Sequence, residues 1–189
     1  MKNLVLIIIC INLSFCKNAT QQNNDALPAD TNLTASNVQD TSLPVTTVAK
    51  PILIPLDSSK VKPDELVAFA TSLIGVPYKY GSTDPSQGFD CSGFITHVFN
   101  HFNVKVPRSS VDFTNVGLEV PLQEAATGDL VLFTGTDSSI RVVGHMGIIT
   151  ENTDSVRFIH STSGRQYGVT ITALGDYYMG RFVKVIRIF

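Results

Sequence analysis

One cysteine and two histidines of this sequence have the residue types and the spacing for nucleophilic catalysis. Cys91 lies at the centre of residues 88–94, after the polar, turn-rich run 81–88. The apolar residues that follow have the spacing of a helix face: Phe94, Ile95, Val98, Phe99 and Phe102. We therefore expect Cys91 at the N-terminus of a helix, where unpaired N–H groups and the helix dipole favour negative charge. There the thiol pKa should fall from roughly 8.5, and the thiolate is the nucleophile.

A cysteine nucleophile needs a base, and His145 is the best candidate for it. His145 interrupts an apolar run, and the nearby glycines Gly144 and Gly147 clear space around its ring. His160 ends the next predicted strand, so adjacent antiparallel strands would bring it beside His145. There it could accept the second ring N–H and orient the base. The alternative for His145 is a core histidine whose ring bonds a backbone carbonyl.

The other two histidines, His97 and His101, are four residues apart on the predicted Cys91 helix. This spacing can present two metal ligands on one helix face. However, no nearby Glu, Asp or Cys completes a ligand set, and the pair begins nearly two turns beyond Cys91. We interpret them as solvated or half-packed side chains. For Cys91 itself, the alternative is a small buried core residue, but Asp90 and Ser92 beside it make a poor core setting.

The order of predicted elements is helices first and strands afterwards. A helix should start at Pro63 and end at Gly75, the Cys91 helix should end near Asn103, and residues 107–110 should open a short third helix. Strands are predicted at 130–133, 142–150, 156–160, 169–171 and 182–189, separated by short turns. This pattern indicates an α+β fold in which N-terminal helices pack on a mostly antiparallel sheet.

Composition limits the classes of protein that this chain can represent. It has 189 residues, of which 43% are hydrophobic, enough for one domain with a core. The net charge is −2 and lysines and arginines do not cluster, so we expect no nucleic-acid partner.

The N-terminal region resembles an export signal. Residues 1–16 contain an apolar run that is too short to span a membrane comfortably, and residues 13–16 resemble the lipobox of bacterial lipoproteins. We expect lipidation at Cys16, a flexible polar linker over 17–61 and a catalytic domain over 62–189. The protein would then be exported to the cell envelope and held at a membrane by its lipid. The alternative is an ordinary cleaved signal peptide in which Cys16 has no role.

Four motifs in order resemble the NlpC/P60 family of papain-like cysteine peptidases. They are Asp90-Cys91-Ser92-Gly93-Phe94, residues 128–133, residues 144–148 and residues 158–160, and the segments 78–81 and 107–110 fit flanking motifs. The likeness covers about residues 64–188. It implies a papain-like core in which a helix carrying the cysteine packs on a small sheet carrying the histidine.

The resemblance also implies roles for particular residues. Cys91 would be the nucleophile, His145 the general base and then acid, and His160 the orienting residue. A backbone N–H at the helix start would help to hold the oxyanion. The resemblance implies three substrate-binding residues: Tyr80, which would lie against the nucleophile, and Asp90 and Ser92, which would line the pocket. For Asp90 two roles stay open, pairing with the free amine of an N-terminal L-Ala or capping the Cys91 helix.

The activity that the resemblance implies is hydrolysis of peptidoglycan stem peptides. The expected bond is the γ-D-glutamyl–diamino-acid bond, cleaved through a thioester acyl-enzyme with no metal or other cofactor. Expected partners are stem peptides or muropeptides and, through the lipid anchor, a membrane; we expect a monomer. The alternatives are an amidase or acyltransferase that uses another amide substrate on this scaffold, and a non-catalytic lipoprotein that binds the wall.

Overall fold

The computed structural model describes residues 61–189. The predicted signal peptide, the lipidation site Cys16 and all but the last residue of the predicted 17–61 linker lie outside this range. No helix within residues 61–189 combines the length and the apolar character that a membrane span requires.

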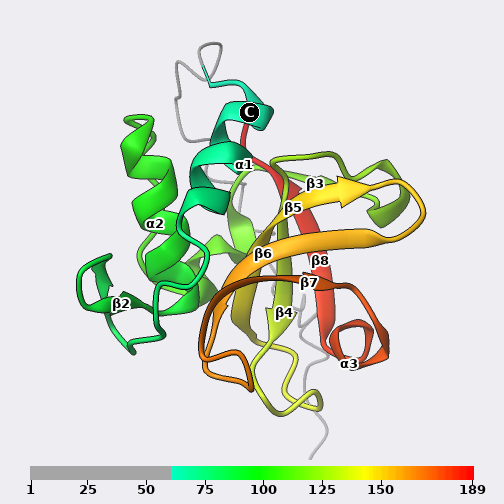
Figure 1. Cartoon of the computed structure of the whole chain (residues 1–189). Helices are drawn as coiled ribbons and strands as arrows, with labels where there is room; N and C mark the ends of the chain where they lie inside the picture. The colour runs from blue at the N-terminus through cyan, green and yellow to red at the C-terminus, as the bar shows by residue number, and fades with distance from the viewer. Residues whose placement is uncertain (1–60) are drawn as a thin grey trace, which may run out of the picture. The chain divides into compact units, whose positions relative to one another are not determined.

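Two α-helices form the layer that carries the cysteine (Figure 1). Helix α1 (Pro63–Ser72) starts on a proline with two acidic residues in its first turn and buries Leu66 and Ala70. Helix α2 (Cys91–His101) buries the apolar face predicted for it, Phe94, Ile95, Val98 and Phe99. Both helices are confirmed, although α2 ends two residues before Asn103, which has a positive φ of 61°.

The remaining chain forms a six-stranded sheet in the order β3-β8-β4-β5-β6-β7, with every neighbouring pair antiparallel. The strands are β3 (Leu118–Val120), β4 (Leu130–Thr134), β5 (Val143–Asn152), β6 (Val156–Thr162), β7 (Gly168–Ala173) and β8 (Phe182–Arg187). The five strands predicted from the sequence correspond to β4–β8. The α+β class with a mostly antiparallel sheet is therefore confirmed.

Several short elements complete the fold. A two-stranded hairpin, β1 (Thr83–Asp84) and β2 (Gly88–Phe89), leads into α2. The predicted third helix is a 3₁₀ helix, η2 (Ser110–Asn115), which begins at the last residue of the predicted segment. A second 3₁₀ helix, η3 (Leu122–Glu124), precedes β4, and a single turn, α3 (Asp176–Met179), precedes β8. No pattern in the sequence predicts β3, η3 or α3.

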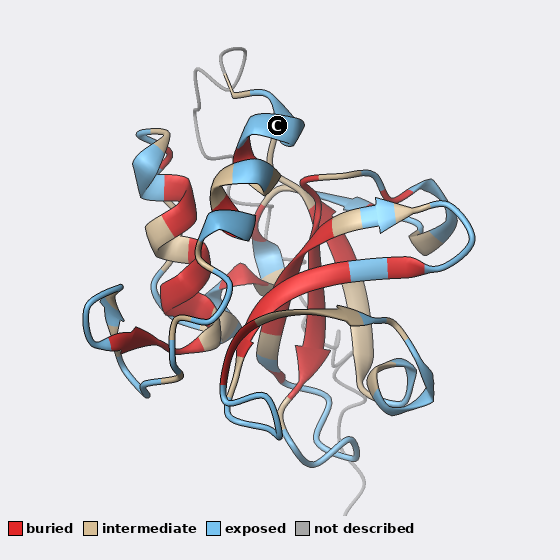
Figure 2. Ribbon diagram, in the orientation of Figure 1, coloured by how far each residue is buried: buried red, intermediate tan, exposed pale blue. Residues whose placement is uncertain are grey.

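Apolar residues cover both faces of the central strand β4, which is buried along its whole length (Figure 2). Leu130 and Leu132 pack in a cluster with residues of α1 and α2. Val131 and Phe133 pack in a second cluster with residues of β6 and β8. A buried hydrogen bond of 2.7 Å from Ser161 on β6 to the carbonyl of Phe89 fixes the hairpin before α2 to the sheet. This bond fixes the position of the N-terminus of α2 relative to the sheet.

Candidate active site

Cys91 is the first residue of α2, as the sequence predicts, and its side chain lies close to the start of β5. Its Sγ atom is 3.9 Å from the carbonyl oxygen of Gly144, the residue before His145. Glycine is required at position 144, because an added Cβ would lie 2.8 Å from the backbone of Gly135, the residue that follows β4. The fold therefore brings the thiol to the backbone that carries His145.

Three neighbouring strands supply a hydrogen-bonded chain of side chains that ends at His145. The Nε2 atom of His145 on β5 is 2.8 Å from Nδ1 of His160 on β6. The Nε2 atom of His160 is in turn 2.9 Å from Oγ1 of Thr172 on β7. The structure thus brings His160 beside His145 as expected. Thr172 was not foreseen, because a threonine in a short strand carries no signal of such a role.

Because Nε2 of His145 contacts His160, Nδ1 is the ring nitrogen of His145 that is left to act as a base. When His145 donates from Nε2 to His160, His160 carries its own proton on Nε2 and donates it to the Thr172 hydroxyl. The Nδ1 atom of His145 is then unprotonated. The same two contacts also fit the opposite tautomers, with the Thr172 hydroxyl as donor. We assign the first arrangement because it leaves Nδ1 of His145 available to accept a proton.

Aromatic rings pack around the two histidines, of which His160 is fully buried and His145 is half-buried. The rings of Phe133 and Tyr178 have centroids 6.0 and 6.1 Å from that of His145, and Phe158 lies 4.7 Å from His160. Burial lowers the pKa of His145 well below its ordinary value, with His160 and Arg181 acting in the same direction. Burial, followed by the charge of Arg181, lowers the pKa of His160 to about 4. Both rings are therefore neutral at pH 7.

The expectation that the helix N-terminus lowers the thiol pKa is wrong in this structure. Burial of the thiol, followed by the negative charge of Asp90, raises the pKa of Cys91 to about 11. Backbone N–H groups of Ser92 and Cys91 favour the thiolate, but their effect is smaller. The resting pair is therefore a neutral thiol beside a neutral imidazole.

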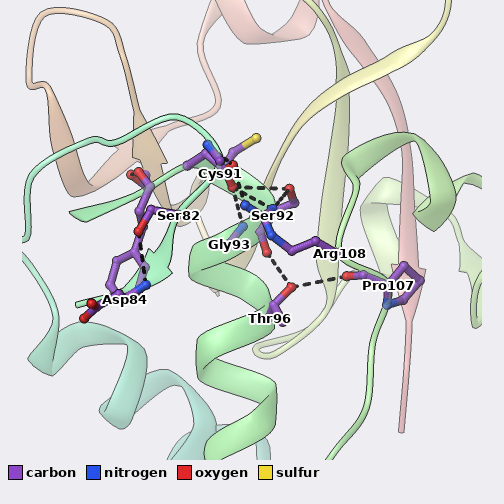
Figure 3. Close-up of polar contacts among 12 residues, drawn as sticks. Ser82, Asp84, Cys91, Ser92, Gly93, Thr96, Pro107 and Arg108 are labelled. Carbon is purple, nitrogen blue, oxygen red and sulfur yellow. Dashed lines mark hydrogen bonds and ion pairs between the residues drawn. The ribbon is translucent and has the colours of Figure 1, made fainter. Parts of the chain in front are cut away.

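Asp90 is the N-cap of α2 and the centre of a polar network (Figure 3). Its Oδ1 accepts hydrogen bonds from the Gly93 N–H at 2.6 Å and from Nη1 of Arg108 at 3.0 Å. Its Oδ2 accepts from the Gly81 N–H at 2.8 Å and from Nη2 of Arg108 at 2.7 Å. Of the two roles left open for Asp90, helix capping is the one present here. Arg108 belonged to a flanking motif, but its pairing with Asp90 was not foreseen.

Ser92 takes part in the same network, because its hydroxyl accepts from Nη1 of Arg108 at 3.0 Å. Thr96, one turn further along α2, donates to the carbonyl of Pro107 at 3.2 Å (Figure 3). This bond holds the segment before Arg108 against α2. The guanidinium of Arg108 is thus positioned by Ser92 and Asp90 on one side and by the anchored backbone at Pro107 on the other.

Two cavities meet at Cys91. One, of about 510 Å³, contains Tyr80, Asp90 and Ser92 in its lining, together with Arg108. The other, of about 640 Å³, is lined by His145 and by residues of the loop after β6 and of α3. The three residues proposed to bind substrate thus lie on one side of the thiol, and the proposed base lies on the other. Together the cavities form a groove with Cys91 between its two halves.

Of the two tyrosines of the segment 78–81, Tyr78 is the one that lines both cavities. Its pKa is raised by burial and, next, by the charge that Cys91 carries when ionised. Tyr80 is 87% exposed and lines only the cavity that contains Asp90. The role of Tyr80 stays a prediction, and Tyr78 joins it as a candidate that the sequence did not single out.

His97 and His101 lie away from this groove. The ring of Phe69 on α1 stacks on His101 at 3.7 Å and on His97 at 5.9 Å between centroids. His97 is half-buried and His101 is exposed with its ring stacked on Phe69, in agreement with their interpretation as solvated or half-packed side chains. Neither lines the cavities at Cys91.

A cysteine at a helix N-terminus, beside a histidine that a second polar side chain orients, is the arrangement of a cysteine peptidase. The NlpC/P60 family model matches residues 75–187, which is more than half of the chain. The chain belongs to the NlpC/P60 family. The family predicted from the four motifs is therefore confirmed.

Known relatives are named as endopeptidases and hydrolases. A probable endopeptidase of Haemophilus influenzae is 36% identical over 118 residues, which cover 60% of this chain and 67% of that protein. The gamma-DL-glutamyl hydrolase of Bacillus subtilis is 30% identical over 123 residues, 65% of this chain but only 29% of that protein. The crystal structure of an NlpC/P60 family protein from Bacillus cereus matches with a TM-score of 0.60 and 26% identity. That match covers 68% of this chain and 40% of the other.

Proposed function

We propose that this protein is a cysteine endopeptidase of peptidoglycan stem peptides that cleaves the γ-D-glutamyl–diamino-acid bond. The observation that carries the proposal is the meeting of Cys91 and the His145–His160–Thr172 chain at one groove. The bond is suggested by relatives, among them the gamma-DL-glutamyl hydrolase and a gamma-D-glutamyl-L-lysine dipeptidyl-peptidase of Bacillus subtilis.

The first half of the proposed reaction forms a thioester. The Cys91 thiol gives its proton to Nδ1 of His145 as Sγ attacks the γ-carbonyl carbon of the glutamyl residue. In this scheme His145 acts as a general base toward a neutral thiol, in keeping with the raised pKa of Cys91 and the lowered pKa of His145. The N–H groups of Cys91 and Ser92, which favour charge on the sulfur, are candidates to hold the oxyanion. The C–N bond then breaks, and His145 returns the proton to the leaving amine.

The second half releases the product. Water attacks the thioester carbon while His145 removes one of its protons. The C–S bond then breaks, His145 gives that proton to the sulfur, and the carboxylic acid product loses its own proton to solvent as the carboxylate forms. His160 and Thr172 hold the ring of His145 in one tautomer through both halves. His145 thus carries the proton in both halves of the reaction, first from the thiol to the amine and then from water to the sulfur.

The test is a digest of purified muropeptides followed by mass spectrometry of the fragments. Wild-type protein should leave fragments that end in γ-D-glutamate and new diamino-acid amino termini. Cys91→Ala and His145→Ala should each lower the rate at least 10³-fold while keeping the melting temperature within a few degrees. As a matched control, His101→Ala removes a histidine outside the groove and should keep the rate.

Other digest results separate the alternatives. Fragments cut at another amide bond would indicate an amidase on a different substrate, and transfer of the acyl group to an added amine without hydrolysis would indicate an acyltransferase. Binding to the wall with no cleavage would indicate a non-catalytic lipoprotein. Full activity of Cys91→Ala would contradict the assigned nucleophile.

We further propose that the protein is exported and held at a membrane through a lipid on Cys16. The support is the lipobox-like sequence alone. Metabolic labelling with a clickable fatty acid tests it. Wild type should take up the label and Cys16→Ser should not, whereas equal labelling of both would contradict the proposal.

A further inference from the structure

We propose that the groove at Cys91 selects stem peptides whose amino terminus is acylated over those that end in a free ammonium group. This inference rests on the proposed function and names the substrate class of that site. Within the wall, the first alanine of a stem is joined to the glycan through an amide, so its nitrogen carries no charge. A stem released from the glycan has a free amine, which is charged at neutral pH.

The only carboxylate in the described lining of the two cavities is that of Asp90, and its acceptor positions are occupied. Each oxygen accepts one backbone N–H and one guanidinium N–H at 2.6–3.0 Å. The Asp90 side chain is only 10% exposed, whereas that of Arg108 is 42% exposed. A substrate that enters this half of the groove therefore meets the guanidinium before it meets the carboxylate.

Whereas Arg108 and Asp90 form a neutral ion pair in the first half, the other half of the groove is positively charged. Its lining contains Arg165 and Arg181 and no aspartate or glutamate. Arg181 donates to the carbonyls of Thr134 and Gly135, which fixes its guanidinium in the wall of the cavity. Arg165 is exposed. An ammonium group beside Arg165 and Arg181 would have only cations as charged neighbours, and beside the Arg108–Asp90 pair it would find the carboxylate oxygens already occupied.

The chemical consequence is a preference set by charge. N–H donors of arginine suit the carbonyl of an acylated amine and the carboxylates of a stem peptide, and they repel an ammonium group. An amine-recognition role for Asp90 would require the carboxylate to be free and accessible. The network at Asp90 provides neither condition.

The experiment compares two synthetic tripeptides, L-Ala-γ-D-Glu-diamino acid with a free amino terminus and the same peptide with that amine acetylated. At pH 6.5 we expect kcat/KM to be at least 10-fold higher for the acetylated peptide. The difference should shrink towards pH 9, because the free α-amine loses its charge around pH 8. A purely steric preference for the acetyl group would not change with pH in this way.

Two variants locate the effect. Arg108→Gln removes one cation and uncovers Asp90, so it should shift the ratio of the two kcat/KM values towards the free amine by about tenfold. Arg165→Gln tests the other half of the groove in the same way. The control is Arg157→Gln, an exposed arginine of β6 that lines neither cavity and should leave the ratio unchanged.

Each result decides the proposal. A preference of wild type for the free amine, or equal rates at every pH, would overturn the inference while leaving the proposed function intact. Cleavage of neither peptide at the γ-D-glutamyl bond would instead refute the proposed function and this inference together. Binding of both peptides to Cys91→Ala, measured by calorimetry, gives the same comparison without turnover.

Discussion

The hydroxyl of Thr172 influences the protonation of His145, because it is the last member of the hydrogen-bonded chain His145–His160–Thr172. In the assigned tautomer it accepts a hydrogen bond from Nε2 of His160, which leaves Nδ1 of His160 unprotonated to accept from His145. Without an acceptor at Thr172, the opposite tautomers of both rings become accessible. Those tautomers place a proton on Nδ1 of His145 and remove the base.

We therefore predict that Thr172→Val lowers kcat about tenfold with little change in KM. The variant keeps the shape of the side chain and should keep the melting temperature within a few degrees. Thr172→Ser restores the hydroxyl and should recover most of the rate. Steady-state kinetics on a defined stem peptide checks this. An unchanged kcat in Thr172→Val would show that His160 needs no partner at this position.

The N-terminus of α2 is the element on which the site depends, and Gly93 shows how closely it is packed. A Cβ at Gly93 would lie 2.0 Å from the carbonyl oxygen of Ser82 and 2.8 Å from Oδ1 of Asp90. Glycine here is needed for a close approach of two backbones and not for a special φ angle. The loop over residues 81–82 can then reach the network of Asp90.

We predict that Gly93→Ala destabilises the protein by about 2 kcal/mol, although alanine is the better helix former by about 1 kcal/mol. Strain at the helix start should outweigh propensity. The control is Asn100→Ala, at an exposed position of the same helix, which should leave stability equal or slightly higher. Urea unfolding measures both. Equal stabilisation by the two substitutions would contradict the packing described at Ser82.

The elements with a periodic apolar face were predictable, and those held by tertiary contacts were not. The spacing of Leu66 and Ala70, and of the apolar residues after Cys91, predicts α1 and α2 because burial follows the helix period. Strand β3 has only three residues and forms by pairing with β8, so its sequence alone has no strand pattern. Helix α3 is a single turn, too short to show a helical pattern in its sequence.

The same contrast applies to the site. Three chemically reactive residues stand out from their sequence neighbours, and the structure brings them to one groove: Cys91, His145 and His160. The contact of Arg108 with Asp90 joins residues eighteen apart whose pairing depends on the segment before η2. The raised pKa of Cys91 follows from burial, and burial of the thiol depends on tertiary contacts that the local sequence does not predict.

At the scale of the whole molecule, the buried histidines link stability to pH. His160 is fully buried and has a pKa of about 4, whereas an unfolded histidine has a pKa near 6.5. Between these values the unfolded chain binds a proton that the folded chain does not. The free energy of unfolding therefore falls as the pH drops from 6.5 to 4. The contribution of His160 is about 3 kcal/mol at pH 7 and is lost by pH 4.

We predict that His160→Asn is less sensitive to acid than wild type. The difference in free energy of unfolding between the two proteins should change by about 3 kcal/mol in favour of the variant between pH 7 and pH 4. Urea titrations across this range measure it, and the shared acidic groups cancel in the comparison. Parallel pH curves for the two proteins would mean that His160 is not held neutral by burial.

In the proposed reaction Cys91 carries the acyl group of the substrate as a thioester. Trapping with hydroxylamine detects such a thioester directly. Hydroxylamine added to a reaction with a defined γ-D-glutamyl peptide competes with water for the thioester. Wild type should form a γ-D-glutamyl hydroxamate, and Cys91→Ala should form none. Mass spectrometry of the products detects it. Peptide cleavage that continues with only the carboxylate as product, or a hydroxamate formed equally by Cys91→Ala, would contradict a thioester on Cys91.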